Sequence, residues 1–190
     1  LNIPPDAFVV GIVARMQPHR RFEDFFAAIA LLAKNVPQTK VIVVGRGTRQ
    51  RQVGFDPVQK LGLGDRVHFP GYVDGENYVG MLKAFDVQVM LVPGTDGTCR
   101  AVREGMAMAK PMVVARRGML PELVQDGTTG LVTDGSPQEL YAALHRLATN
   151  RQYARTLGRA GREHAQNEFS LSKQADRVSE LYDKILSRKI

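Results

Sequence analysis

The sequence predicts an α/β fold: a doubly wound parallel sheet of about six strands, followed by a helical C-terminal tail. Short β-branched runs alternate with amphipathic stretches of helical period, which is the pattern of a βαβ series. Most of these runs are too uniformly apolar to keep one face in water, as is typical of parallel strands covered on both sides. After residue 135 only helices are expected.

The individual elements follow from these patterns. Strands are expected over residues 8–14, 40–44, 66–69, 87–92, 111–115 and 130–132. Helices are expected between them over residues 21–34, 56–62, 75–84, 99–109 and 119–125, and in the tail over residues 137–148, 151–165 and 171–187. Ser136-Pro137-Gln138-Glu139 has the sequence of a capping box, and further caps are expected at Asp56, Asp74 and Ser170.

The composition is that of one globular domain. Of 190 residues, 44% are hydrophobic and 24% charged, which excludes a disordered chain, a coiled coil and a collagen-like repeat. The one cysteine, Cys99, cannot form an internal disulfide, and no apolar run reaches the roughly 18 residues of a membrane-spanning helix. We therefore expect a cytoplasmic protein. Because the chain starts at Leu1 rather than at methionine, we also expect it to be part of a longer polypeptide.

The formal net charge of +7 is spread evenly. Residues 1–95 contribute +3 and residues 96–190 contribute +4, so neither half forms a basic arm and nucleic-acid binding is not expected. Eighteen of the 26 basic residues are arginine. Most would lie on a solvated surface, and peripheral contact with an anionic membrane is the alternative.

Ligands of open α/β sheets bind beyond the carboxyl ends of the strands, so the residues that follow each strand are candidate ligand-binding residues. Arg15, Arg20 and Arg21 follow the first strand, with the last two at a helix start. Cations there oppose the helix dipole, which favours an anionic ligand, with a solvated basic turn as the alternative. Gly45-Arg46-Gly47 follows the second strand but lacks the remaining glycine of a dinucleotide fingerprint and the lysine of a Walker A loop.

The segment after the fourth strand holds two carboxylates eight residues apart, Asp96 and Glu104. Because Gly97 leaves backbone amides accessible at the helix start, these two carboxylates could bind a ligand that bears hydroxyls and phosphate. The alternative is that Asp96 only caps the helix and that Glu104 only lies on the surface. Cys99 has no identifiable base partner. The four histidines lack metal-ligand spacing and there is no Asp-x-Asp pair, so no metal site is expected.

Taken in order, the segments VARMQPHRR, VIVVGRG, LGLGDRVHFPGYV, DGTCRAVREGMAMAKPMVVA and GMLPELVQDGTTGLV carry a family resemblance. Together they resemble the C-terminal, donor-binding domain of GT-B-fold retaining glycosyltransferases of family 4, also called group 1, over roughly residues 3 to 170. This resemblance implies a nucleotide-sugar donor and an acceptor domain that lies N-terminal to this chain.

The resemblance also implies roles for residues. Arg15 and Arg20 would neutralise the donor diphosphate. The Glu-x7-Glu motif of the family lies over Asp96 and Glu104, which would contact the donor sugar and the ribose hydroxyls. The remaining donor-binding positions are Gly45, Gly47, Val73, Gly97, Thr98, Cys99 and Arg100.

The implied reaction is metal-independent transfer of a hexosyl group, with retained anomeric configuration, to a glycan or lipid-linked acceptor. No cofactor is implied, and the isolated chain is expected to be inactive. The sequence departs from the family pattern at Asp96 for glutamate, Thr98-Cys99 for Phe-Gly, Gly105 for alanine and Lys110 for glycine. The alternative is therefore a degenerate, non-catalytic domain that binds phosphate or a partner.

Overall fold

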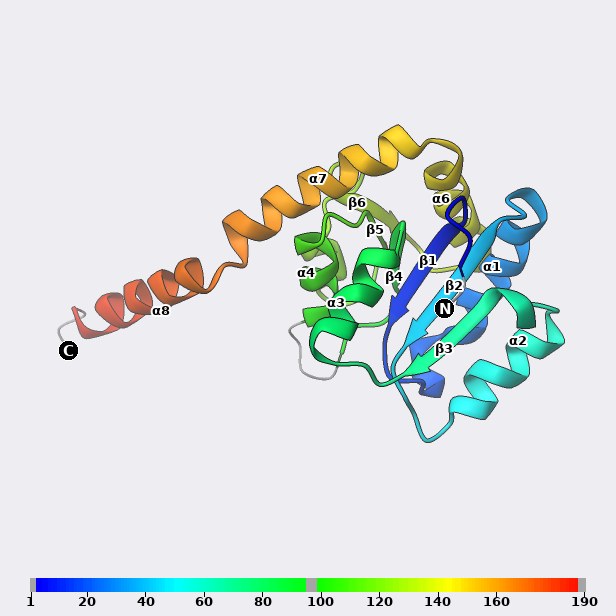
Figure 1. The fold of residues 1–190 in the computed structure, drawn as a ribbon. Coiled ribbons are helices and arrows are strands. Elements are labelled where there is room, and N and C mark those ends of the chain that lie inside the picture. The colour runs from blue at the N-terminus through cyan, green and yellow to red at the C-terminus, as the bar shows by residue number, and fades with distance from the viewer. Residues whose placement is uncertain (1–2, 95–98, 188–190) are drawn as a thin grey trace.

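The computed structural model describes residues 3–94 and 99–187 and confirms the expected fold class. The strands are β1 (Phe8–Val13), β2 (Thr39–Val44), β3 (Val67–Gly71), β4 (Val87–Met90), β5 (Met112–Ala115) and β6 (Gly130–Thr133). They form one parallel sheet in the order β3-β2-β1-β4-β5-β6 (Figure 1). The order of strands in the sheet reverses between β1 and β4, which makes the carboxyl ends of these two strands the expected place for a ligand.

The helices agree with the expected ranges to within a few residues. They are α1 (Phe22–Asn35), α2 (Asp56–Lys60), α3 (Gly75–Ala84), α4 (Arg100–Ala107), α5 (Leu120–Leu123), α6 (Pro137–Thr149), α7 (Arg151–Glu168) and α8 (Leu171–Leu186). Short 3-10 turns lie at Pro18–Arg20 and Gly64–Arg66, and a π-helical turn lies at Arg51–Phe55.

Both faces of the sheet are buried, because alternate residues of each strand point to opposite sides. Val10 and Ile12 of β1 belong to the larger core, which also contains residues of α1 and α6, whereas Val9 packs in a smaller core with Leu82 of α3. A third cluster joins α4 and the end of α7 to β4 and β5. Helices thus cover the sheet on both sides, as the uniformly apolar strands predict.

The expected helix caps are confirmed in part. The hydroxyl oxygens of Ser136 and Ser170 accept hydrogen bonds from the backbone amides three residues on. The reciprocal bond of the capping box is displaced, since the Glu139 carboxylate accepts from the amide of Asp134. Asp74 occupies the N-cap of α3 without a side-chain bond. The expected cap at Asp56 is wrong, because the helical segment already begins at Arg51.

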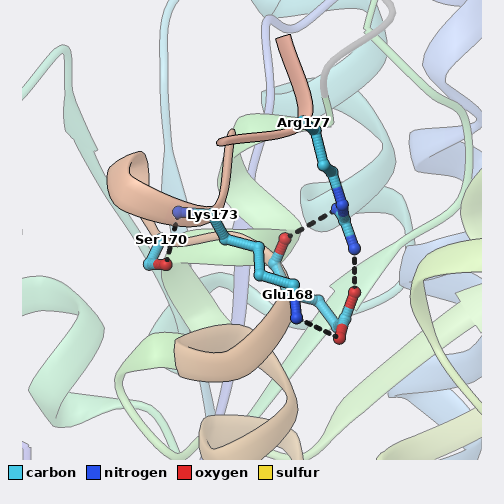
Figure 2. A network of polar contacts seen from close by, with 4 residues as sticks. All are labelled: Glu168, Ser170, Lys173 and Arg177. Atoms are coloured by element: carbon cyan, nitrogen blue, oxygen red, sulfur yellow. Dashed lines mark hydrogen bonds and ion pairs between the residues drawn. The ribbon is translucent and has the colours of Figure 1, made fainter. Parts of the chain in front are cut away.

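Helix α8 points away from the sheet and touches the rest of the domain at its junction with α7 (Figure 1). Figure 2 shows the polar contacts at that junction: Lys173 lies 3.7 Å from the Glu168 carboxylate, and Arg177 bonds both this carboxylate and the Glu168 carbonyl. Several large apolar side chains of α8 are exposed: Leu171, Val178, Leu181, Tyr182, Ile185 and Leu186. Among the described helices, none is long and apolar enough to cross a membrane.

Candidate functional site

A pocket of about 640 Å³ opens at the carboxyl ends of β1, β2 and β4, where the strand order predicts a ligand. Helices α3 and α4 supply the remaining walls. The described residues that line it are Val13, Ala14, Arg15, Arg20, Val44, Gly45, Arg46, Tyr72, Val73, Asp74, Gly75, Tyr78, Met90, Gly94, Cys99, Arg100, Ala101 and Glu104.

The two arginines predicted after β1 both line this pocket, in different environments. Arg15 is exposed, and within the described residues it forms no ion pair. Arg20 is buried, and its Nη1 donates to the carbonyls of Val92 and Pro93, at 2.9 and 2.6 Å. Arg15 therefore presents a solvent-exposed charge to the pocket, while the charge of Arg20 is held by two backbone carbonyls.

Arg21, the third cation of this segment, has another role. It is the N-cap residue of α1, in the left-handed conformation at φ 59°, and its Nε donates to the carboxylate of Asp24. Arg21 is not among the residues that line the pocket. The bond to Asp24 in the first turn of α1 thus accounts for this cation, and Arg15 and Arg20 are the residues of this segment that can meet an anionic ligand in the pocket.

The glycines after β2 let two backbone segments touch. A Cβ at Gly45, where φ is +137°, would overlap the carbonyl oxygen of Ala14, and a Cβ at Gly47 would overlap that of Met16. The Met16 amide also donates to the Arg46 carbonyl. Gly45 lines the pocket and Gly47 does not. The second glycine therefore positions the loop after β1, which carries Arg15.

The N-terminus of α4 faces the pocket. Its N-cap residue, Cys99, has a left-handed backbone at φ 46°, a conformation that favours glycine. The first turn of α4 holds no acidic residue and the N-cap side chain makes no capping bond. The predicted residues Asp96, Gly97 and Thr98 lie outside the described residues. The positive end of the helix dipole, together with Arg100, thus favours negative charge in the pocket.

Glu104, on the second turn of α4, has partners on both carboxylate oxygens. The Tyr78 hydroxyl donates to Oε2 at 2.5 Å, and the Nε of Arg100 lies 3.5 Å from Oε1. Burial, and then the bond to Glu104, raise the pKa of Tyr78 well above its ordinary value, so its phenol stays protonated. Tyr78 was not predicted from the sequence; the signal would have been a polar-tipped aromatic on the inner face of the helix that follows Val73.

The last predicted position, Val73, lies in the loop after β3 and lines the pocket between Tyr72 and Asp74. The pairing of β3 with β2 shifts register between Ile42 and Val44, and the Gly45 amide donates to the Gly71 carbonyl. This irregular pairing brings the Tyr72–Asp74 segment to the edge of the pocket.

The described pocket lining is basic: it holds four arginines (Arg15, Arg20, Arg46 and Arg100) against two carboxylates, Asp74 and Glu104. A polyanion with hydroxyl groups matches this arrangement, since the arginines attract phosphate and the carboxylate of Glu104 accepts hydrogen bonds from hydroxyls. No group of three or more His, Cys, Asp and Glu side chains that could hold a metal ion is found in residues 3–94 and 99–187. Metal independence stays a prediction.

Known proteins share both the sequence pattern and the fold. A D-inositol 3-phosphate glycosyltransferase from Saccharomonospora viridis is 31% identical over 96% of this chain, which covers 44% of that relative. The structure of Anabaena HepE in complex with UDP-glucose matches 94% of this chain and 49% of its own, with a TM-score of 0.81 and 25% identity. The C-terminal domain of the Francisella tularensis group 1 protein LpcC shares the fold, with a TM-score of 0.75 and 20% identity over 86% of this chain and 87% of its own.

The chain spans less than half the length of the curated relatives it matches. The family model described as glycosyl transferases group 1 matches residues 1–164. This match takes in the sheet, the pocket and most of α7. The chain belongs to the group 1 glycosyl transferases.

Proposed function

We propose that this chain is the nucleotide-sugar-binding half of a retaining, metal-independent glycosyltransferase. The observation that carries the proposal is the pocket, which is lined by four arginines, by the N-terminus of α4 and by a hydrogen-bonded glutamate. The arginines and the helix end suit a diphosphate, and Glu104 suits the vicinal hydroxyls of a ribose. HepE of Anabaena, which shares the fold, was solved in complex with UDP-glucose.

In the proposed reaction, the bond between the anomeric carbon and the diphosphate breaks, the acceptor oxygen bonds to the same carbon on the same face, and the proton of the acceptor hydroxyl passes to the leaving diphosphate. Negative charge builds up on the leaving diphosphate. Arg15 and Arg20 would stabilise this charge, Arg20 from a buried position that is already fixed before the ligand arrives. Asp96, which lies outside the described residues, would contact the donor sugar.

The acceptor, which we propose is a glycan or a lipid-linked sugar, would bind across a cleft on an N-terminal domain that this chain does not contain. This chain covers only 44% of the length of the Saccharomonospora viridis relative, which fits the proposal of a second domain. The relative's name points to a phosphorylated polyol as one acceptor to test. The isolated chain would then bind donor and transfer nothing.

Calorimetric titration of the chain with UDP-, GDP- and ADP-sugars tests the donor proposal. We expect heat of binding with one nucleotide series, unchanged by EDTA, and a weaker signal for the Arg15→Ala variant. Sugar transfer by the isolated chain would contradict the proposal that the reaction needs a separate acceptor-binding domain. With the full-length enzyme, the anomeric configuration of the product, read by NMR, tests retention.

A degenerate binding domain is the second candidate, and the backbone of Cys99 favours it. Cys99 has a backbone φ of 46° at a position where the family pattern has glycine. Its side chain therefore lies next to the N-terminus of α4, which would bind the phosphate. This candidate predicts no heat with any nucleotide-sugar, together with retained binding of inorganic phosphate or anionic vesicles.

A further inference from the structure

The hydrogen bond between Tyr78 and Glu104 joins two helices that are separate in the sequence. Tyr78 lies on the second turn of α3, and its backbone amide donates to the carbonyl of the N-cap residue Asp74. Glu104 lies 26 residues later on α4. Both side chains line the pocket, so the bond spans the pocket wall from one helix to the other.

The phenol is the firmer of the two partners of Glu104. The side chain of Arg100 is 81% exposed and its Nε stands 3.5 Å from the carboxylate, so solvent screens this pair and its charge adds little restraint. The Tyr78 hydroxyl is half-buried and donates at 2.5 Å to a carboxylate, which is the short, charge-assisted kind of hydrogen bond. Tyr78 therefore does most to hold the Glu104 side chain in one rotamer.

The direction of this bond leaves Glu104 able to accept more. An ionised carboxylate has about four lone-pair sites and the phenol occupies one of them, on Oε2. An ordinary phenol is already a donor at neutral pH, and burial and the neighbouring carboxylate raise the pKa of Tyr78 further. The free lone pairs of Glu104 then have a fixed direction, set by α3 as well as by α4.

We propose that Tyr78 is a positioning residue, which holds the Glu104 carboxylate so that its remaining lone pairs face the vicinal hydroxyls of a nucleotide ribose. The proposal rests on the proposed function of the pocket as a nucleoside diphosphate site. It adds that recognition of the sugar hydroxyls depends on a residue that acts through Glu104, whereas recognition of the diphosphate by Arg15 and Arg20 does not depend on it.

A comparison of matched nucleotides tests this role. The chain and its Tyr78→Phe variant are titrated with UDP, GDP and ADP, and the best-bound of these is compared with its 2′,3′-dideoxy counterpart. We expect Tyr78→Phe to weaken ribonucleotide binding about three- to tenfold, the cost of ordering one side chain on binding. Binding of the dideoxy nucleotide, which lacks the hydroxyls, is expected to be unchanged.

Two further variants separate positioning from damage to the pocket. Tyr182→Phe removes the hydroxyl of an exposed tyrosine on α8, which is not among the residues that line the pocket, and is expected to bind every nucleotide as the parent chain does. In a Glu104→Gln background, Tyr78→Phe is expected to weaken ribonucleotide binding little further, because the carboxylate that Tyr78 positions is absent. The midpoint of thermal unfolding, measured for each variant, identifies loss of fold.

The outcomes distinguish this proposal from the proposed function. Equal ribonucleotide binding by the parent chain and Tyr78→Phe, or an equal loss for ribo- and dideoxynucleotides, would overturn the positioning role while the nucleotide site stands. Absence of binding of UDP, GDP and ADP to the parent chain would overturn both.

Discussion

The side-chain amide of Gln88, in the middle of β4, occupies the space that a methyl group at Gly105 of α4 would need. Its Nε2 donates to the carbonyl of Ala101 at 2.7 Å, which ties the first turn of α4 to the sheet. Its Oε1 is buried and has no hydrogen-bond partner within the described residues. Gly105, which departs from the alanine that the family resemblance implies, is therefore explained by a polar neighbour in the core.

We expect Gly105→Ala to destabilise the domain by about 1–3 kcal/mol, because the added methyl overlaps Gln88, although alanine favours helix. The free energy of unfolding from urea titration measures this. In a Gln88→Ala background the same change should cost much less. Equal costs in the two backgrounds would contradict the explanation.

Arg15 and Arg20 are expected to respond differently to truncation. Arg15→Ala should change stability by less than about 0.5 kcal/mol, since the side chain is exposed, and should weaken nucleotide binding about tenfold. Arg20→Ala should also lower stability by about 1–3 kcal/mol, because two part-buried hydrogen bonds are lost. Thermal unfolding and calorimetry on both variants separate the two effects.

Gly47 should be intolerant of a side chain although it does not line the pocket. In Gly47→Ala, the added methyl group overlaps the backbone of Met16 and forces the loops after β1 and β2 apart. We therefore expect the free energy of unfolding to fall by more than about 1 kcal/mol and nucleotide binding to weaken. Gly80, in the middle of α3, has open space around it. Gly80→Ala serves as the control and should stabilise the domain by about 0.5–1 kcal/mol. Similar stability of the two variants would refute the loop contact.

Acidification should weaken the fold through His68 of β3. Its Nε2 is buried with no hydrogen-bond partner within the described residues, and burial, followed by the charge of Lys40, lowers its pKa. The unfolded chain then takes up a proton near pH 6.5 before the folded one does, so stability is present above that pH and is lost as the pH falls below it. Urea midpoints between pH 8 and pH 5 measure this loss, and His68→Gln should flatten the curve just below pH 6.5.

Removal of residues 171–190 should leave the domain folded. Helix α8 is joined to α7 by surface contacts of Lys173 and Arg177 with Glu168, which contribute at most about 1 kcal/mol each. We expect an unfolding transition as cooperative as that of the full chain, measured by circular dichroism, and higher solubility because exposed apolar residues are removed. A broad transition would show that α8 supports the sheet.

The elements that the sequence predicted best are those with a strong local pattern. Short β-branched runs, most of them uniformly apolar, located all of the described strands, and α3 was predicted with the observed bounds. The turn at Arg51–Phe55 was missed because RQVGF has neither an apolar period nor a cap. The prediction of a cap at Asp56 was wrong as a consequence, because the missed turn starts the helical segment before Asp56.

Two residues of the site were predicted from their position directly after a strand. Arg15 and Gly45 reach the pocket because parallel strands end at a common edge, whereas Val73, which also lines the pocket, was predicted from the family resemblance. Contacts between distant segments could not be predicted. The burial of Arg20 depends on carbonyls more than 70 residues away, and the bond from Tyr78 depends on how α3 packs beside α4.

All described residues that line the pocket fall between Val13 and Glu104, whereas β5, β6 and the helices after them complete the sheet and its covering layers. For protein engineering, this separates the gene into a recognition cassette and a supporting cassette. A library that varies only the first cassette can search for new ligand preferences while the second remains unchanged. Stabilising substitutions can be gathered in the second cassette and combined with any selected first one.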